Sequence, residues 1–440
     1  SYPGVTWVTG MAIASRLQHS EQQVLDKVPY FTVVKRDYHL GVYRSTLVTT
    51  YAFRNPALQA LKIGGAGGLP STATFTVESN IQHGPFPGLH TVALAVVDST
   101  IELPPALQQE LSGVIGSKPL LKFHTTLDLF GGATSDLTSP AFSLRLADGS
   151  NLVWGGLTGT LTASRNQVRW SARLSAPHLL AQGAQGGFEL TGAEYSGSHE
   201  KALDGLYAGT GTFTIERMDG SAPRPGADFS MQRISLTSTS KADGEFLDMR
   251  VDVAMDAAKI AAVQLTNVMY SESFEHLYGP SLASLADAIR TAQRQAGGDP
   301  QQLRAGMSDA FRQYGIDLVL HDPVLNIRQV SFTMPEGSLL LSARISAPGL
   351  GRGDLQQWPG AIMALRAHAA ATADLRVDNG LLQKLLAMGG SNPKVAAQLT
   401  SFEQQGYLTA GPTAVTTHLE LSGGSITLNG HPFPPAPPVN

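Results

Sequence analysis

Apolar and polar residues alternate along several segments in the first part of the chain. Leu121–Leu129, Val168–Ser175 and Asp248–Asp256 carry apolar side chains at every second position, with mainly charged or hydroxylated side chains between them. Because successive side chains of a strand point to opposite faces, this period of two predicts strands with one apolar and one polar face. Such strands are typical of antiparallel sheets that are wetted on one side.

Short turn sequences separate these strands. Ala147–Ser150, Met218–Gly220 and Ala242–Gly244 each contain an Asp-Gly pair. Asp-Gly between alternating segments is a strong signal for a hairpin turn. We therefore expect turns at these three places, and strands that pair mainly with their neighbours in the sequence.

Helical periodicity appears later in the chain. Ser281–Ala296 places Leu282, Leu285 and Ile289 on one stripe, and Asp299-Pro300 has the form of an N-cap followed by the first position of a second helix, which ends at Gly315. Two more helices are predicted, one from Asp378 to Gly389 and one from Asn392 to Gly406. Strands are expected around these helices at 323–334, 338–347, 414–421 and 425–429.

These patterns predict an α+β fold that is predominantly antiparallel β. We expect an elongated, curved or twisted sheet of many hairpin-connected strands, with about four helices packed on it. No clear linker interrupts residues 1–430, which we take as a single β-rich domain that can be subdivided into an all-β part, 1–270, and a mixed part, 271–430. The Pro-rich tail, 431–440, is expected to be polyproline-like or disordered.

Composition narrows the function classes. The chain has 440 residues and a formal net charge of −4, so nothing favours an electrostatic nucleic-acid binder. Only 15% of the residues are charged, against a usual value of about 25%. The sequence contains no cysteine, which excludes disulfides, thiol catalysis and cysteine-bound metal centres. The absence of thiols fits an envelope compartment.

The motifs of common enzymes are absent. The sequence has no Gly-x-Ser-x-Gly nucleophile elbow and no phosphate-binding loop, and His199-Glu200 lacks the second histidine of a metalloprotease helix. Asp248, Asp252 and Asp256 fall on one face of a predicted strand, where a solvated surface is favoured over a calcium or catalytic role. We therefore predict no catalytic residue, no cofactor and no metal site. A protein that is not an enzyme is favoured, with a hydrolase as the remote alternative.

The run His83–Pro87, His-Gly-Pro-Phe-Pro, is the most unusual short segment of the chain. Its prolines and glycine restrict the backbone, and proline cannot continue a central strand. We expect a rigid corner after a strand that directs Phe86 into the core, so that Phe86→Ala would cost about 3–5 kcal/mol and His83→Ala much less, unless His83 caps a buried backbone group. Contact with a ligand or partner is the alternative. Catalysis is disfavoured, because no acid or nucleophile adjoins His83.

Five segments, spread in order along the chain, resemble the bacterial YdgA family, whose function is unassigned. Tyr38–Ser45 is similar to its Tyr-x-x-Gly-[hydrophobic]-[aromatic]-x-Ser segment, and His83–Pro87 matches its His-Gly-Pro-Phe-Pro motif. Asp322–Val324 and Ser425–Gly430 resemble later segments, and Thr9-Gly10 resembles the point just after the N-terminal membrane helix of the family. The residues that carry the two more specific motifs are Tyr38, Gly41, Ser45, His83, Gly84, Pro85, Phe86 and Pro87.

The resemblance implies a location as well as a fold. Members of the family are anchored to the inner membrane of Gram-negative bacteria and place a large domain in the envelope. We therefore expect a periplasmic protein that reaches the membrane through an N-terminal helix that is not part of this chain. The resemblance implies no reaction, cofactor or catalytic residue.

Two functions compete for a protein of this composition. A sheet with one apolar face needs a cover, and four helices, each about 10 Å wide, shield only about eight strands spaced ~4.8 Å apart. The uncovered part would form a groove that binds or conducts a lipid or another apolar ligand, with the candidate lining residues Trp170, Leu174, Phe213, Ile215, Val251 and Val253. A closed sheet sandwich would bury the same residues. The second function is a structural or interaction scaffold of the envelope that self-associates as a homo-oligomer.

The expected membrane anchor gives the first prediction. The full-length gene should encode an apolar stretch of about 20 residues directly before Tyr2, because that length spans a bilayer as a helix. Sequencing the codons upstream of Tyr2 checks it. A cleavable soluble leader, or a native start at residue 1, would contradict both the anchor and the expected location.

Overall fold

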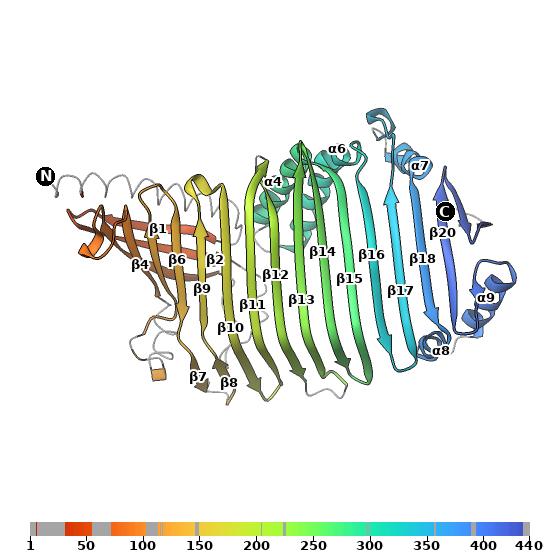
Figure 1. The fold of residues 1–440 in the computed structure, drawn as a ribbon, viewed down its shortest axis with the longest axis horizontal. Coiled ribbons are helices and arrows are strands. Elements are labelled where there is room, and N and C mark those ends of the chain that lie inside the picture. The colour runs from red at the N-terminus through yellow and green to blue at the C-terminus, as the bar shows by residue number, and fades with distance from the viewer. Residues whose placement is uncertain are drawn as a thin grey trace. The chain divides into compact units, whose positions relative to one another are not determined.

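Strands make up most of the described residues in the computed structural model of the chain (Figure 1). The structure describes residues 6, 31–54, 72–102, 113–114, 116, 118–145, 149–203, 205–222, 226–296, 299–355, 358–388 and 393–433. Contacts between Cα atoms divide the chain into two compact units. The first unit comprises residues 1–201, 218–224 and 286–310, and the second comprises 202–217, 225–285 and 311–440.

The first unit is built on an antiparallel sheet. Its strands are β1 (Phe31–His39), β2 (Arg44–Arg54), β3 (Thr72–His83), β4 (Ala95–Glu102), β5 (Lys122–Leu127), β6 (Ala133–Ser139), β7 (Phe142–Arg145), β8 (Asn151–Trp154), β9 (Leu157–Ala163), β10 (Arg169–Gly183) and β11 (Gly186–Leu203). They pair in the order β1–β2–β3–β4–β5–β6–β9–β10–β11. β7 pairs with β8, which also pairs with β10, so β6–β7 and β8–β9 form the two interrupted arms of one hairpin.

The second unit contains an antiparallel meander. Its strands are β12 (Leu206–Ser221, of which 206–217 belong here), β13 (Phe229–Asp243), β14 (Phe246–Ile260), β15 (Val263–Tyr278), β16 (Val324–Met334), β17 (Gly337–Ser346), β18 (Ala370–Asp378), β19 (Thr409–Ala410), β20 (Ala414–Ser422), β21 (Ser425–Leu428) and β22 (His431–Phe433). From β13 to β18 each strand pairs with the next. β20 then pairs with β18, β19 and β21, and β21 with β22.

Helices occupy the longer connections between strands. α4 (Gly279–Ala296), α5 (Pro300–Ala310), the π-helical turn η3 (Phe311–Gly315) and α6 (Ile316–Val319) follow β15, α7 (Trp358–His368) follows β17, and α8 (Asn379–Met388) and α9 (Pro393–Gln404) follow β18. The 3-10 turns are η1 (Pro87–Leu89), η2 (Arg165–Gln167) and η4 (Arg352–Leu355). The four helices predicted from the sequence are confirmed, whereas α7 is not predicted by the pattern.

The predominantly antiparallel β fold predicted from the alternation is also confirmed. β14 contains Asp248–Asp256, β10 contains Val168–Ser175 except its first residue, and β13 and β14 are joined at the predicted Asp243-Gly244 turn. β5 contains only the middle of Leu121–Leu129, because the chain turns after Leu127. Pairing with residues distant in the sequence can, however, override a local preference for a turn or for disorder.

Two predictions about local structure are wrong for this reason. Met218–Gly220, predicted as a turn, lies inside β12. There the Ser221 carbonyl oxygen lies so close to Gly186 that a Cβ on Gly186 would be 2.2 Å from it, so neighbouring backbone holds the segment extended. The tail is not polyproline-like or disordered over its first three residues, because His431–Phe433 pairs with β21 as an edge strand, a position that tolerates proline. Residues 434–440 lie outside the described residues.

Buried apolar residues gather in small clusters. Ile81, Ala95 and Val97 form one in the first unit, with Tyr38 and Leu47 packed against it. In the second unit, Met334, Val377 and Leu381 form a cluster where α8 meets the ends of β16–β18. A further cluster surrounds Leu350 with side chains of α6 and α7. The helices of the second unit therefore pack locally at the ends of strands.

Leu381 should be the main anchor of α8. Its side chain is fully buried against β16 and β18, so Leu381→Ala should destabilise the second unit by about 2–5 kcal/mol through lost packing and a residual cavity. Urea unfolding checks this. The matched control is Leu385→Ala in the same helix, which should cost about 1 kcal/mol or less because Leu385 is 37% exposed. Equal effects of the two substitutions would contradict the anchor.

Candidate functional site

A buried serine–histidine pair connects the two sequence motifs of the first unit. His83 ends β3, and its Nε2 lies 2.9 Å from the Oγ of Ser45 in β2. The other ring nitrogen, Nδ1, lies 3.2 Å from the carbonyl oxygen of Val42. The backbone N–H of His83 donates to the Tyr43 carbonyl oxygen at 3.0 Å. The end of β3 is thus tied to the β1–β2 turn by three hydrogen bonds.

The glycines of both motifs are required by close backbone approaches. A Cβ on Gly41 would lie 2.2 Å from the Arg44 carbonyl oxygen, and a Cβ on Gly84 would lie 2.0 Å from that of Ala93. Gly84 also donates its N–H to the Leu94 carbonyl oxygen at 2.8 Å. Both glycines therefore keep the chain tight on either side of the buried histidine, and Tyr38 packs on the cluster around Ile81 below it.

The corner itself differs from the prediction. Phe86 does not point into the core, since it is 48% exposed. The buried residues of the corner are His83, Gly84 and Pro87. The physical reason is that His83 has two polar partners on β2 and the β1–β2 turn, so its ring can be buried with both nitrogens satisfied. The buried residue that anchors the corner is thus the histidine, and the prediction that Phe86 anchors it is wrong.

Ser45 and His83 have the atoms of a nucleophile–base pair without access to a substrate. An Nδ1–H bonded to a carbonyl oxygen leaves Nε2 to accept from a serine hydroxyl, which is the tautomer that serine hydrolases use. However, Ser45 is 3% exposed and His83 is 2% exposed. The Oγ of Ser45 is also approached by the N–H of Gly41 at 3.4 Å. In this arrangement the pair acts as a structural link between strands.

An apolar face runs across the strands of the second unit. The strand register aligns its side chains in rows perpendicular to the strands. One row contains Leu236, Val253, Tyr270, Val330, Leu341 and Leu375, and a parallel row contains Met249, Phe274, Leu325, Ile345 and Ala371. Between the rows Glu272 accepts a hydrogen bond of 2.5 Å from the Tyr270 hydroxyl, which raises the pKa of Tyr270. The face is thus mainly apolar and carries one hydrogen-bonded polar pair, Tyr270 and Glu272.

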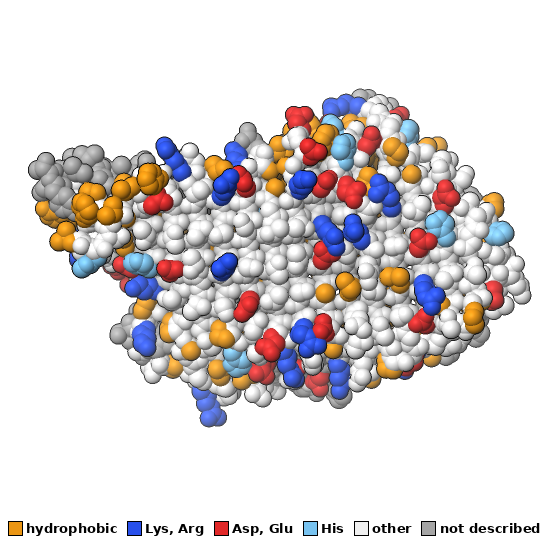
Figure 2. Space-filling model, viewed as in Figure 1, with side chains coloured by type: hydrophobic (Ala, Val, Ile, Leu, Met, Phe, Trp, Pro, Cys, Tyr) orange, Lys and Arg blue, Asp and Glu red, His pale blue; other side chains and the backbone are white. Residues whose placement is uncertain are grey.

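This apolar face is open to solvent. Leu236, Met249, Tyr270, Phe274 and Ile345 are 36–43% exposed. Neighbouring side chains on one face of a sheet lie about 5 Å apart and partly cover each other, so these fractions indicate that no second layer of the described residues covers these five side chains. Side chains of the neighbouring register positions, such as Asp252 and Ser271, lie on the opposite face of the same strands and are polar. Figure 2 shows one face of the molecule, on which charged side chains are scattered and hydrophobic ones are few over the long strands. The sequence left open whether the apolar face would be a groove or a closed sandwich. These five side chains are exposed, whereas Leu375, at the end of its row, packs against the cluster around Leu381 of α8.

The residues predicted to line a groove fall in both units. Val251 and Val253 lie on the open face of β14, where Val253 pairs with Leu236 and Tyr270. Thr212 and Thr237 bring their hydroxyls within 3.5 Å on the polar face, so the adjacent Phe213 projects from the apolar face of β12. Ile215, two residues further along β12, is buried.

Trp170 and Leu174 belong to β10 of the first unit. Trp170 stacks on His199 with ring centroids 4.3 Å apart, and burial lowers the pKa of His199. Leu174 packs against the backbone of Gly159, because a Cβ added to Gly159 would lie 2.4 Å from the Cδ2 of Leu174. These two residues pack against neighbours within their own sheet.

The aspartate row of β14 is used for structure. Asp248 accepts the N–H of His276 at 2.8 Å, and Asp256 pairs with Arg233. Asp252 accepts from Arg250 at 2.8 Å and from Ser271 at 2.6 Å. Partial burial opposes ionisation of Asp252, but these hydrogen bonds outweigh it, so its pKa is lowered. The three carboxylates thus each have a separate partner, as expected for a polar strand face.

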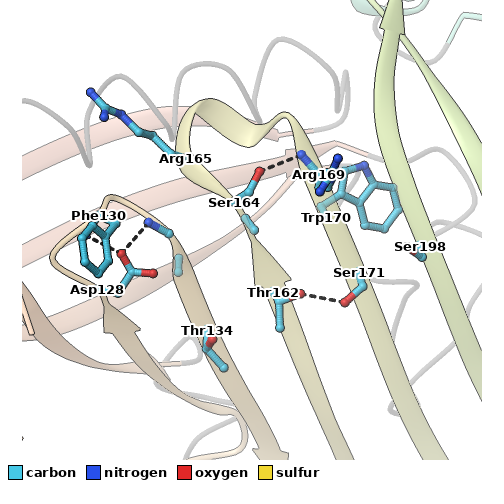
Figure 3. Close-up of a pocket in the computed structure, with 13 residues that line it drawn as sticks. Asp128, Phe130, Thr134, Thr162, Ser164, Arg165, Arg169, Trp170, Ser171 and Ser198 are labelled. Atoms are coloured by element: carbon cyan, nitrogen blue, oxygen red, sulfur yellow. Dashed lines mark hydrogen bonds between the residues drawn. The ribbon is translucent and has the colours of Figure 1, made fainter.

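A shallow polar pocket of about 430 Å³ lies on the first unit (Figure 3). Its floor is a row of hydroxyls from four paired strands, Thr134, Thr162, Ser171 and Ser198. The hydroxyl oxygens of Thr162 and Ser171 are hydrogen-bonded at 2.7 Å. Asp128 at the rim accepts the N–H of Phe130 at 2.7 Å, so this carboxylate supports its own turn. The pocket offers polar contacts and is unlike the open apolar face.

Neither a metal centre nor a spanning helix is found within the part of the chain that the structure describes. No group of three or more His, Asp or Glu side chains there is placed to hold a metal ion. In the same residues, no helix combines the length and apolar character needed to cross a membrane.

The sequence motifs did not identify the exposed rows of the second unit. Leu236, Phe274 and Ile345 carry no motif, and their signal is the alternation of β13, β15 and β17 itself. Alternation assigns a residue to a face, but it does not report whether another layer covers that face.

Comparison with known proteins assigns the chain at the family level alone. The model of DUF945, described as a bacterial protein of unknown function, matches residues 1–436. No curated protein and no solved structure matches the chain.

The buried pair leads to a stability prediction in which His83 meets the exception stated for it, because its ring bonds a backbone carbonyl oxygen, and in which Phe86 matters less than expected. His83→Ala should cost about 2–4 kcal/mol, because it opens a cavity and leaves Ser45 Oγ and the Val42 carbonyl oxygen without their partner. Phe86→Ala should cost about 1 kcal/mol or less, because Phe86 is half-exposed. Urea unfolding of both variants checks the order. A larger loss for Phe86→Ala would restore the first interpretation.

Proposed function

The chain belongs to the DUF945 family of bacterial proteins of unknown function, and we propose that it is a non-enzymatic envelope protein whose open sheet face binds or conducts an apolar ligand such as a lipid. The single observation that carries the proposal is the set of exposed apolar side chains on one face of β13–β17, namely Leu236, Met249, Tyr270, Phe274 and Ile345. Apolar rows continuous across several strands are costly to expose to water, so an occupant is expected.

The chemistry of the face favours a lipid-like occupant. Its rows combine aliphatic side chains such as Leu236 and Ile345 with the aromatic rings of Tyr270 and Phe274. The Tyr270–Glu272 pair adds a hydrogen-bonding group within the apolar surface. Ligand sites typically combine an apolar lining with a few polar groups of this kind, and an amphiphile matches both. Rows that run across strands also give an acyl chain a continuous path.

Two further features support the non-enzymatic and envelope parts of the proposal. The serine–histidine pair that comes closest to a catalytic couple is buried. The segments at Tyr38–Ser45 and His83–Pro87 support a relationship to the YdgA proteins, and with it a periplasmic location and an N-terminal membrane anchor. The lack of cysteine is consistent with that compartment.

The apolar face should carry lipid when the protein is purified. We expect the organic extract of the 440-residue chain to contain a lipid in near-stoichiometric amount by mass spectrometry, and the delipidated chain to bind a fluorescent fatty acid. Leu236→Gln combined with Phe274→Gln should weaken fatty-acid binding by roughly tenfold or more, because each substitution removes about 1–2 kcal/mol of apolar contact. Both side chains are exposed, so the fold should be retained.

The control substitution is Ser235→Gln, one residue from Leu236 and on the polar face of β13, where it pairs with Ala254. It should leave lipid content and fatty-acid binding unchanged. A chain that carries no lipid and takes up no fatty acid would refute the proposal. A concentration-dependent oligomer that the Leu236/Phe274 double variant dissociates would instead support the self-associating scaffold.

A further inference from the structure

Three turns at one end of the first unit expose bulky apolar side chains. Tyr43 lies in the β1–β2 turn, Phe86, Leu89 and Val92 in the β3–β4 loop, and Leu129 and Phe130 in the β5–β6 turn. These six side chains, which we call the apolar tip, are 48–84% exposed. Figure 2 shows hydrophobic side chains gathered over this end of the first unit. Turns are usually polar, so apolar residues concentrated at three of them need an explanation.

The three turns lie side by side. The N–H of His83 donates to the Tyr43 carbonyl oxygen at 3.0 Å, that of Gly84 to Leu94 at 2.8 Å, and that of Leu94 to Leu127 at 2.8 Å. These bonds connect the first turn to the second and the second to the third. Adjacent turns are separated by two strand spacings, about 10 Å, so the apolar tip extends over roughly 20 Å.

Each turn is held in shape by its own hydrogen bonds. Ser45 and His83 fix the first turn from below. In the second, Leu89 donates its N–H to the Phe86 carbonyl oxygen at 3.0 Å and Ala93 to Pro85 at 3.2 Å. In the third, Asp128 accepts the N–H of Phe130 and, at 3.0 Å, that of Gly132. The side chains are therefore presented in fixed positions.

The backbone of Leu89 is strained. Its φ is 64°, a left-handed conformation that bulky side chains rarely adopt, and it is 80% exposed. No burial of the leucine within the chain compensates for this backbone strain. Strain retained at an exposed position is characteristic of residues that act in binding.

The charged residues beside the apolar tip indicate which kind of partner it would bind. Arg44 beside the first turn and Arg165, whose side chain packs along Gly131 of the third, are both exposed. Asp128 is an acidic residue of the third turn, but its Oδ1 is directed at backbone N–H groups of that turn. These three residues together carry two positive charges and one negative charge, and the two guanidinium groups are available to anionic lipid headgroups.

We propose that the apolar tip inserts into the interface of a lipid bilayer, with Arg44 and Arg165 at the level of anionic headgroups. Leu89 and Phe130 are 80% and 84% exposed, so most of each side chain projects beyond its neighbours. Protein interfaces need complementary surfaces of about 800 Å² on each partner, whereas a fluid bilayer accommodates separate apolar projections. This site is separate from the open face of the second unit and does not depend on it.

Vesicle binding tests the proposal. The 440-residue chain should co-sediment with phosphatidylcholine vesicles that contain phosphatidylglycerol, and less with pure phosphatidylcholine. Leu89→Asn combined with Phe130→Ser should reduce partitioning by roughly tenfold or more, because two inserting side chains are lost. Asparagine tolerates the left-handed conformation at position 89, so the fold should be kept. Arg44→Gln with Arg165→Gln should remove the preference for anionic vesicles, as should high salt.

Matched controls separate this site from general stickiness and from the proposed lipid face. Met363→Ser with Met388→Ser removes two exposed apolar side chains from α7 and α8 and should leave vesicle binding unchanged. The Leu236/Phe274 variant should also bind vesicles normally, and the Leu89/Phe130 variant should keep its fatty-acid binding. Vesicle binding therefore tests the apolar tip and fatty-acid binding tests the open face, so a negative result in one measurement leaves the other proposal standing.

Insertion can be read directly with a tryptophan reporter. Phe130→Trp should gain fluorescence that brominated lipids quench, whereas Met363→Trp should not. The proposal is overturned if the parent chain does not bind vesicles, or if the Leu89/Phe130 variant partitions like the parent. It is equally overturned if that variant abolishes a homo-oligomer of the parent seen by light scattering while vesicle binding is unaffected, which would make the apolar tip a protein interface.

Discussion

The constraint on which the structure depends is the alternation of side chains along a paired strand. Backbone hydrogen bonds hold each strand between its neighbours, so every second side chain must point to the same face. In β13–β18 this places aliphatic and aromatic rows on one face and hydroxyl, amide and charged groups on the other. A one-residue slip would move each side chain to the wrong face, and therefore the register and the chemistry of the two faces are determined together.

The helices of the second unit leave part of the apolar sheet face exposed. α8 inserts Leu381 beside Met334 and Val377, and α6 and α7 surround Leu350, so each helix buries its apolar side at strand ends. The rows through Leu236 and Phe274 keep their exposure. An apolar surface of this kind is a liability for a protein that has no occupant for it, which is the physical basis for assigning it to a ligand.

The first unit contains a buried polar pair, Ser45 and His83, that links two of its strands. Ser45 and His83 satisfy each other inside the sheet, and His83 also reaches the Val42 carbonyl oxygen. The link fixes the two turns that carry Tyr43 and Leu89, and Asp128 does the same for the turn that carries Phe130. Rigid turns lose little conformational entropy when their side chains enter another phase, so a structural pair can support a binding surface without contacting its partner.

Most strands and helices, and the face on which a strand residue lies, can be predicted from the amino-acid pattern alone. The alternation of Asp248–Asp256 predicted β14, the stripe of Ser281–Ala296 predicted α4, and Asn392-Pro393 predicted the start of α9. These features depend on near neighbours in the chain, whose spacing the sequence states directly. Only the tertiary structure decided burial, because burial depends on what lies opposite a residue in space. It exposed Phe86 and buried His83, extended Met218–Gly220 beside Gly186, paired His431–Phe433 with β21, and left the rows of the second unit uncovered.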